Sequence, residues 1–546
     1  MKRYITLAVI AAFCCSVTNA QQQGLPSRSM TIEGAYNPTV TSSDKILPVP
    51  ERTTTVREPA AVSYLTEPNP MTGMERNTLA AFSETADDFK PARYAGMVRF
   101  GYGLRNIHDG LADFDWRITD RDELKVSGQM DAWASKPVDD WKSRMFNADL
   151  KIAYAHRFDK FTLGVDGAIG HSHFNYMEGV AMDSAKASKS NLMQKVLRGE
   201  IGASVAGKTA DVEWYLKAGM QWLSRSGLEL VGTERNNKES LLRIEGGAEM
   251  PLLGGTGGLY YRQKTAMYDW QGLYGDDYEG FSTITLSPYW KQSWGALDAR
   301  MGLNVDFRTA AGYKVMASPM LNAVYNLNDR IKLLADLTGG VVDNSMRTLS
   351  TVSPYWSELA RIMDGYTLAN FSLGATYSAG TWFTLSAKGG YRHTINELFQ
   401  IPDDNLIVTS ILLQQSSDVF YGRLDADMLF GDFAELRMDV TCSGYSGDYA
   451  LGSLALKPVV DASLFGNIKV MQGLDAMLTY RLMAFNEVNG SRMPAVNDLA
   501  VTFDYDFRPN LSFYLTGSRL AGGDFYYYSG YRALKPSFQL GATYRF

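Results

Sequence analysis

The sequence predicts an all-β fold, a transmembrane antiparallel β-barrel of about 22 strands that follows an extended N-terminal periplasmic segment. Three observations support this prediction. Apolar and polar residues alternate over most of the chain, tight turns separate the alternating segments, and the chain ends on an aromatic residue. After the first 20 residues no apolar run approaches the ~18 residues of a spanning helix, so membrane helices are not expected.

The first 20 residues have the three-part layout of a secretory signal: a basic start, a short apolar run and small residues before Gln21. Cys14 suggests a lipoprotein, but Phe13 stands where such a signal needs a small residue. We therefore expect a signal peptide at 1–20, removed so that the mature chain starts at Gln21. Because Cys442 is then the one remaining cysteine, no internal disulfide can form.

Composition narrows the class of protein without deciding it. The formal net charge of −6 gives no basic surface for nucleic acid, so no nucleic-acid partner is expected. The mean hydropathy of −0.18 fits a soluble protein, but it also fits a membrane barrel. In such a barrel lipid-facing and lumen-facing residues alternate, and their hydropathies cancel.

Alternation separates these two alternatives. In 297–307 the odd-numbered residues are apolar, while charged and polar residues occupy the even positions, and the pattern recurs in 434–440. Because side chains alternate faces along a strand, one face is apolar and the other is polar. A soluble sandwich also alternates, but its strands average about 5–6 residues and its domains rarely reach ~450. The lumen-facing candidates are Lys217, Asp298, Arg300, Asp306, Glu435, Arg437 and Asp439. Acids and bases are mixed, so no ion selectivity is predicted.

Turns give the strand count. Ten tight connections occur near residues 121–123, 159–160, 207–209, 254–257, 294–295, 328–330, 379–381, 431–432, 467–473 and 508–510. Each joins two strands, and further strands at 94–104 and 533–546 bring the number to about 22. Short turns are typical of the periplasmic side. The longer connections at 178–190, 226–237, 268–280, 343–366, 394–417 and 521–531 are then expected outside.

The C-terminus carries the most specific local pattern. Gln539, Gly541, Tyr544 and Phe546 resemble, position for position, the signal by which outer-membrane barrels are recognised by their assembly machinery. The resemblance implies the barrel assembly machinery as a partner, outer-membrane lipid around the barrel, and location in the cell outer membrane of a Gram-negative bacterium. Cys442 continues an outward apolar set, so we expect it to face lipid.

Residues 21–91 are rich in proline and polar residues, so they predict an extended periplasmic segment before a barrel at 92–546. The motif EGAYNPTV at 33–40, with SPYW at 353–356 and NELF at 396–399, resembles a family of Bacteroidota outer-membrane barrels labelled TonB-dependent-receptor-like. The resemblance implies a transport or receptor role, with TonB or another periplasmic or outer-membrane protein as partner. Residues 21–91 are shorter than the plug of TonB-dependent transporters, so a plug-less barrel is expected.

Catalytic chemistry is not predicted. The chain has five histidines, and His171 and His173 form their one cluster, which could bind a metal but fits two polar residues at a loop mouth better. No spacing places a nucleophile beside a base, so we expect no catalytic residues, no metal and no cofactor, and a protein that is not an enzyme.

Two functional classes remain open. The first is a channel or TonB-dependent-receptor-like transport component for an unknown solute. The second is a non-transporting scaffold or accessory subunit of an outer-membrane complex, for example barrel assembly or secretion machinery. A lumen of ~22 strands is too wide for side chains alone to fill. The loop and lid candidates Tyr355 and Trp356 therefore matter, because their loop predicts a short amphipathic helix that begins at Pro354 and folds inward or docks on a partner.

Overall fold

The structure is a computed structural model of the 546-residue chain. It describes residues 95–104, 106–138, 141–175, 193–226, 236–269, 280–309, 314–356, 363–402, 410–447, 449, 454, 456–488, 491–528 and 531–546. The expected signal peptide and the segment 21–91 lie outside the described residues, as do Leu359 and Ile362 of the loop that holds Tyr355.

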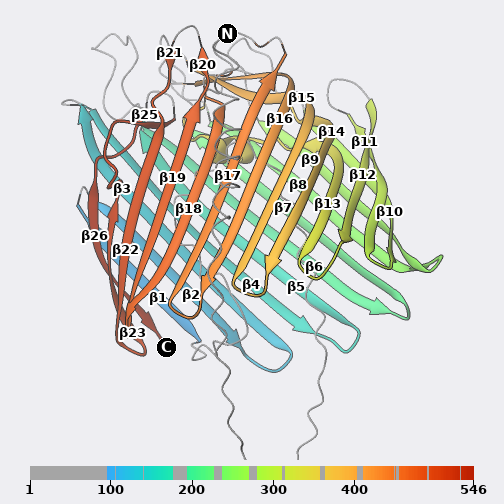
Figure 1. The fold of residues 1–546 in the computed structure, drawn as a ribbon, viewed down its shortest axis with the longest axis horizontal. Coiled ribbons are helices and arrows are strands. Elements are labelled where there is room, and N and C mark those ends of the chain that lie inside the picture. Colours follow the sequence, from blue (N-terminus) through green and yellow to red (C-terminus); the bar gives the residue numbers. More distant parts are fainter. Residues whose placement is uncertain are drawn as a thin grey trace, which may run out of the picture. The chain divides into compact units, whose positions relative to one another are not determined.

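One sheet of 22 antiparallel strands forms the wall (Figure 1). Its strands are β1 (Gly96–Gly103), β2 (Ile107–Arg117), β3 (Asp122–Val138), β4 (Trp141–Arg157), β5 (Phe161–Asn175), β6 (Met193–Thr209), β7 (Val212–Ser226), β8 (Asn236–Leu252), β9 (Gly255–Asp269), β10 (Phe281–Trp294), β11 (Leu297–Arg308), β12 (Lys314–Asn326), β13 (Ile331–Val342), β14 (Gly365–Ala379), β15 (Phe383–Pro402), β16 (Ser410–Phe430), β17 (Ala434–Ser446), β18 (Pro458–Met471), β19 (Leu474–Phe485), β22 (Val496–Arg508), β23 (Leu511–Ser518) and β26 (Ser537–Arg545). Two short hairpins, β20 (Glu487–Val488) with β21 (Ser491–Arg492) and β24 (Tyr526–Tyr528) with β25 (Tyr531–Arg532), stand apart from the wall.

The wall closes on itself. β1 pairs with β2 on one side and with the last strand, β26, on the other, in a register that runs from Met97↔Arg545 to Gly103↔Gln539. A closed sheet satisfies the backbone groups of its strands and leaves no open edge between first and last strand, as a structure surrounded by lipid requires. The prediction of a transmembrane antiparallel barrel with 22 strands is confirmed.

The two ends of the barrel differ. Each of the ten predicted turns lies at or directly beside a tight connection between consecutive wall strands at one end; residues 207–209, for example, end β6, and the connection follows at 210–211. The turn at Gly431, with φ of 57°, joins β16 to β17. The hairpins β20–β21 and β24–β25 lie at the other end, opposite the C-terminus (Figure 1). Because short turns belong to the periplasmic side, we infer that the end with these hairpins is extracellular. Among the described helices, none is long and apolar enough to cross a membrane.

Side chains follow the predicted alternation. On β4 Leu150 and Ile152 are exposed outward, 42% and 46%. Asp149, which directly precedes Leu150, pairs instead with Arg198 at 2.6 Å on the inner face. Exposed aromatic residues gather near the tight turns, and they include Trp116, Phe158, Phe161, Trp294, Trp382, Phe433, Phe507 and Phe546. An apolar outer band edged by aromatic residues is the surface that a lipid bilayer covers.

One predicted loop is wrong. Residues 394–417 were expected to form a long connection, but β15 continues to Pro402 and β16 begins at Ser410. The register shifts between Thr394 and Glu397, where Asn396 has a φ of 55°. Because this β-bulge interrupts the two-residue period, the alternation ends in the sequence although the strand continues.

The predicted helix start is also wrong. The loop between β13 and β14 contains one described helix, α2 (Met346–Val352), and Pro354 follows it rather than beginning it. Ser345 is the N-cap, and its hydroxyl accepts a hydrogen bond from the Thr348 backbone N–H. A serine cap satisfies one of the free N–H groups of the first turn, and this local signal determines where α2 begins.

Candidate functional site

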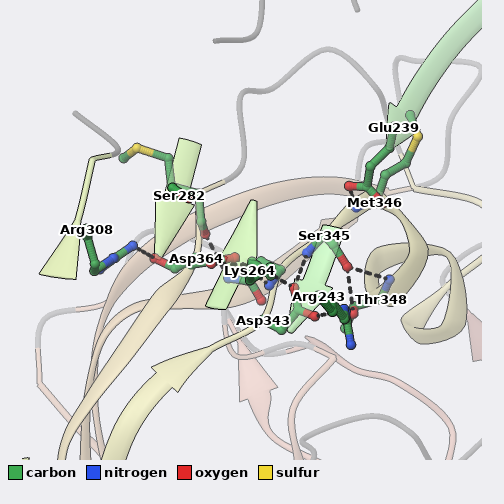
Figure 2. Close-up of polar contacts among 12 residues, drawn as sticks. Glu239, Arg243, Lys264, Ser282, Arg308, Asp343, Ser345, Met346, Thr348 and Asp364 are labelled. Atoms are coloured by element: carbon green, nitrogen blue, oxygen red, sulfur yellow. Dashed lines mark hydrogen bonds and ion pairs between the residues drawn. The ribbon is translucent and has the colours of Figure 1, made fainter. Parts of the chain in front are cut away.

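The loop between β13 and β14 begins at Asp343 and ends at Asp364, and both carboxylates meet Lys264 of β9 (Figure 2). The Lys264 Nζ lies 2.9 Å from Asp343 Oδ1 and 2.6 Å from Asp364 Oδ2. We call these three residues the clasp. Arg243 of β8 adds a 2.6 Å contact to Asp343, and Arg308 of β11 donates to the Asp364 backbone carbonyl at 2.9 Å.

Two of the three clasp side chains are shielded from water, whereas Asp343 is 32% exposed. The side chains of Asp364 and Lys264 are 1% and 10% exposed. Burial raises the pKa of Asp364, and the positive charge of Lys264 offsets only part of this effect. Burial also acts to raise the pKa of Asp343, but the charges of Lys264 and Arg243 outweigh it, and that pKa is lowered. The clasp therefore holds one firmly ionised carboxylate and one that takes up a proton more readily.

A carboxylate of the wall binds the first turn of α2. The Glu239 carboxylate of β8 accepts hydrogen bonds from the backbone N–H groups of Met346 and Arg347, at 2.6 and 3.1 Å. A carboxylate at a helix N-terminus satisfies free donors and interacts favourably with the helix dipole. The Arg347 side chain reaches Glu200 of β6 at 2.8 Å, so α2 lies against the inner faces of β6 and β8.

The lid candidates Tyr355 and Trp356 are 2% and 0% exposed. Arg225 of β7 donates to the backbone carbonyls of Pro354 and Trp356, at 3.0 and 3.3 Å, and its guanidinium lies 4.8 Å from the Trp356 ring. The Tyr355 ring stacks on Tyr531 of β25 with 3.5 Å between centroids. The loop therefore contacts the β6–β11 wall and the β24–β25 hairpin, which belong to different parts of the barrel rim.

Beneath the loop, Asp306 of β11 is 0% exposed and accepts hydrogen bonds from Thr285 and Tyr366, at 2.5 and 3.0 Å. The sequence placed Asp306 on the polar face, but its contact with Tyr366 of β14 depends on the inward position of the loop base.

The other lumen candidates lie among residues of opposite charge or polar partners. Lys217 is opposite Glu245 in the β7–β8 register, and Asp298 accepts from Asn326 at 3.4 Å. The Arg300 guanidinium lies 3.9 Å from the centre of the Tyr289 ring.

On β17 the three candidates form a similar mixed network. Arg437 pairs with Glu435, and Asp439 is 2.8 Å from Arg423 of β16. These contacts give the inner wall no region of a single charge sign, and a role for these residues in transport stays a prediction.

The C-terminal candidates lie at the seam where the barrel closes. Gly541 is opposite Gly101, and a Cβ added to Gly541 would lie 2.2 Å from the Tyr514 ring, so this position has room for glycine alone. Gln539 lies in the same register, opposite Gly103. Tyr544 and Phe546 are exposed outward, 48% and 43%. Their role as an assembly signal stays a prediction.

The two clustered histidines lie apart from the loop. On β5 His171 and His173 have ring centroids 5.9 Å apart, and His173 stacks on Phe146 at 5.0 Å. Across the described part of the chain, no group of three or more His, Cys, Asp or Glu side chains could hold a metal ion.

Sequence reasoning missed the residues of the clasp. Alternation places Lys264 on the inner face of β9, and aspartates delimit both ends of the loop, but nothing in the sequence connects them. The Lys264–Asp343 pair is 79 residues apart, and it forms because the β13–β14 hairpin bends inward.

No family model matches the chain, and no curated protein matches it. Solved structures do match. The siderophore receptor PirA from Acinetobacter baumannii aligns with a TM-score of 0.63 at 14% identity, covering 83% of this chain and 80% of that one. A variant of the ferric enterobactin receptor PfeA from Pseudomonas aeruginosa, in complex with enterobactin, has a TM-score of 0.60 at 11% identity, covering 83% and 81%. The FrpB iron transporter from Neisseria meningitidis has a TM-score of 0.61 at 10% identity, again covering 83% and 81%.

At these identities the similarity is one of fold. The closed 22-stranded wall, its apolar exterior and these neighbours define an outer-membrane β-barrel that shares the fold of these receptors.

Proposed function

We propose that the protein is a TonB-dependent-receptor-like transport component of the outer membrane, in which the loop 343–364 closes the extracellular side of the lumen. The clasp of Lys264, Asp343 and Asp364 is the observation that supports closure. The fold of siderophore and iron-compound receptors supports the transport role. The solute is left unassigned, because the mixed charges of the inner wall favour none.

The burial of charge is the physical reason to regard the inward position of the loop as a stable state that specific contacts maintain. Taking carboxylates out of water is costly unless cations and hydrogen bonds compensate. A loop that merely rested on the rim would keep Asp364 hydrated, whereas here this side chain is 1% exposed. Here five side chains of four wall strands engage the loop at both its ends and at its helix: Glu200, Glu239, Arg243, Lys264 and Arg308.

The proposal includes three parts of the chain: a signal peptide at 1–20, a periplasmic extension at 21–91 that contacts TonB or another periplasmic protein, and the barrel at 92–546. The barrel is plug-less in this proposal, so the loop takes over part of the closure. The barrel assembly machinery recognises the C-terminal residues Gln539, Gly541, Tyr544 and Phe546. No catalytic role is proposed for any residue.

Conductance in planar bilayers tests the proposal. The variant Lys264→Met keeps the length of the side chain and removes its charge, and it is expected to conduct where the unaltered protein is closed. Lys238→Met is the matched control, because Lys238 of β8 forms a largely exposed pair with Asp269 at 3.0 Å and should leave conductance unchanged. An assembled Lys264→Met barrel that stays closed would contradict the proposal.

The second candidate is a non-transporting scaffold or accessory subunit of an outer-membrane complex. The specific observation in its favour is the extent of the closure, since Trp356 and Tyr355 are almost fully buried at the mouth. A scaffold should stay closed in every clasp variant, and it should co-purify in fixed ratio with the same partner from detergent-solubilised outer membrane.

A further inference from the structure

The ladder between β12 and β13 stops halfway up the wall. β12 pairs with β11 along its whole length, from Leu297↔Tyr325 to Arg308↔Lys314. With β13 it pairs only from Asn326↔Lys332 to Leu321↔Leu337. Residues 314–320 of β12 therefore have no ladder partner on their β13 side among the described residues.

The upper part of β13 lies on the lumen side of β11 and β12. The Asn304 side chain of β11 donates to the Gly339 carbonyl at 3.0 Å. A Cβ added to Gly339 would lie 2.6 Å from the Ser318 Cβ of β12. β13 nevertheless keeps its ladder with β14 up to Val342↔Gly365. The two strands therefore bend inward together, and they bring the loop 343–364 to the clasp.

The bend has the residues that a hinge requires. The β13 register shifts between Thr338 and Gly340, and Gly340 has a φ of 133°, which L side chains rarely adopt. On β14 the register with β15 shifts between Thr367 and Ala369, at the same level of the hairpin. Paired bulges with glycine allow two strands to change direction without breaking their own ladder.

The exposed edge of β12 is adapted to being unpaired. Asn326 N–H donates to Ala296 on the β11 side, and Leu327 N–H donates to Ile331 on the β13 side. Since the direction of the backbone N–H alternates along a strand, the odd-numbered residues of β12 direct their backbone nitrogen toward β13. Pro319 is one of them, and proline has no N–H, so it removes one donor from this edge.

The edge also lies in a part of the wall that has an apolar outer face, where Val315 is 58% exposed. A tilted strand rises roughly 2.5 Å per residue along the membrane normal, so residues 314–320 span roughly 17 Å of the outer half of the wall. Unpaired backbone groups are costly in hydrocarbon, which gives this edge a strong preference for a strand partner. The strand that adjoins it is the upper part of β13, which ends at Val342 and would reach Met316 in the continued register.

We propose that the β13–β14 hairpin has a second position in the wall, in which the ladder between β12 and β13 continues up to Met316 and Val342 and the loop residues 343–356 leave the lumen. Continuing the observed register pairs Ala317 with Val341 and Pro319 with Gly339. In this position the loop between β13 and β14 opens the lumen because β13 pairs with the edge of β12. The proposal rests on the gated lumen of the proposed function, and it adds the route by which the gate moves.

A disulfide tests this pairing. In a Cys442→Ala background, Ala317→Cys with Val341→Cys should cross-link under oxidant, because both side chains face lipid from adjacent positions in the paired state. Ala323→Cys with Ala335→Cys is the matched control, since these residues are already paired in the existing ladder. We expect conductance to rise at least about tenfold with the first cross-link, to return with reductant, and to stay unchanged with the control.

The outcomes separate the two proposals. If the control pair cross-links and the 317/341 pair does not, or if it cross-links without a rise in conductance, the second position of the hairpin is wrong. The gated lumen then still stands if Lys264→Met conducts, and it falls if that variant is closed. Pro319→Ala gives an independent measure, because it supplies an N–H that only the paired state satisfies. It should increase the open fraction, and an unchanged or smaller open fraction would count against the pairing.

Discussion

Two buried ion clusters lie at the extracellular end of the barrel, and they differ in what they connect. In the clasp, two carboxylates from one loop share Lys264 of the wall. In the second cluster, which we call the brace, Glu397 of β15 lies 2.8 Å from Lys457 and 3.2 Å from Arg392. With Arg243, the clasp sets two bases of the wall against two acids of the loop, whereas the brace sets two bases against one acid.

The strands around the two clusters explain the difference. At the brace, β15 and β16 resume their ladder above the bulge, from Glu397↔Gln415 to Pro402↔Ser410. At the clasp, β12 and β13 do not resume theirs above Leu321↔Leu337. Buried ion pairs therefore stabilise a continuous extension of the wall at the brace, whereas at the clasp they hold a hairpin away from the wall. In the function that we propose, only the second arrangement connects an ion cluster to closure of the lumen.

The largest expected effect comes from removing the lysine of each cluster. Lys264→Met leaves Asp364 without a side-chain cation. Removing one partner of a buried pair costs about 3–5 kcal/mol, so the closed position should lose most of its population. Lys457→Met leaves Glu397 paired with Arg392, and it should lower thermal stability without opening the lumen. Bilayer conductance and the unfolding temperature of the detergent-solubilised barrel measure the two effects. Conductance in both variants would show that the clusters do not differ as proposed.

The two acids of the clasp are expected to respond unequally. Asp343→Asn removes the carboxylate whose pKa the charges of Lys264 and Arg243 lower, so it should open the lumen strongly. Asp364→Asn removes the carboxyl whose pKa burial raises, so the neutral amide should be tolerated better. The open fraction in bilayers at neutral pH gives the ranking, and equal open fractions in the two variants would contradict it.

The same pair predicts a pH dependence. Because the pKa of Asp364 is raised above its usual 3.8 in the closed state, the closed state takes up a proton as pH falls toward that raised value, and closure strengthens. The lowered pKa of Asp343 means that its contribution is lost only when pH falls below 3.8. The open fraction of the unaltered protein should therefore decrease as the pH falls from neutral toward 3.8, and Asp364→Asn should abolish the decrease. An increase over this range would contradict the assignment.

The smallest expected effect is at the aromatic contact between loop and hairpin. Tyr355→Ala removes the ring stacked on Tyr531, and such pairs contribute about 0.5–1.5 kcal/mol beyond the area they bury. Brief openings of the barrel should appear in conductance recordings, but the clasp should keep the barrel closed for most of the time. Tyr526→Ala, in the same hairpin and only half-buried, is the control. Openings as long as those of Lys264→Met would mean that the ring, rather than the clasp, retains the loop.

The sequence was sufficient for the wall and insufficient for the loop. Alternation and turn residues depend on neighbours in the chain, so the tight turns, the strand count and the polar face with Asp306 could be derived from local pattern. The clasp depends on a hairpin that leaves the wall, and no local pattern marks where β12 and β13 part. The start of α2 was missed because Ser345 was not read as a cap, and the extension of β15 was missed because the bulge at Asn396 interrupts the alternation.

In the proposed function, the loop 343–364 closes the lumen. The most direct test of this closure is the single-channel conductance of a barrel in which residues 344–363 are replaced by a short Gly-Ser linker, compared with the unaltered protein. Heat-modifiable mobility confirms that both barrels are assembled. The account predicts a closed unaltered barrel and a large, steady conductance in the variant. An assembled variant that is as closed as the unaltered protein would contradict it.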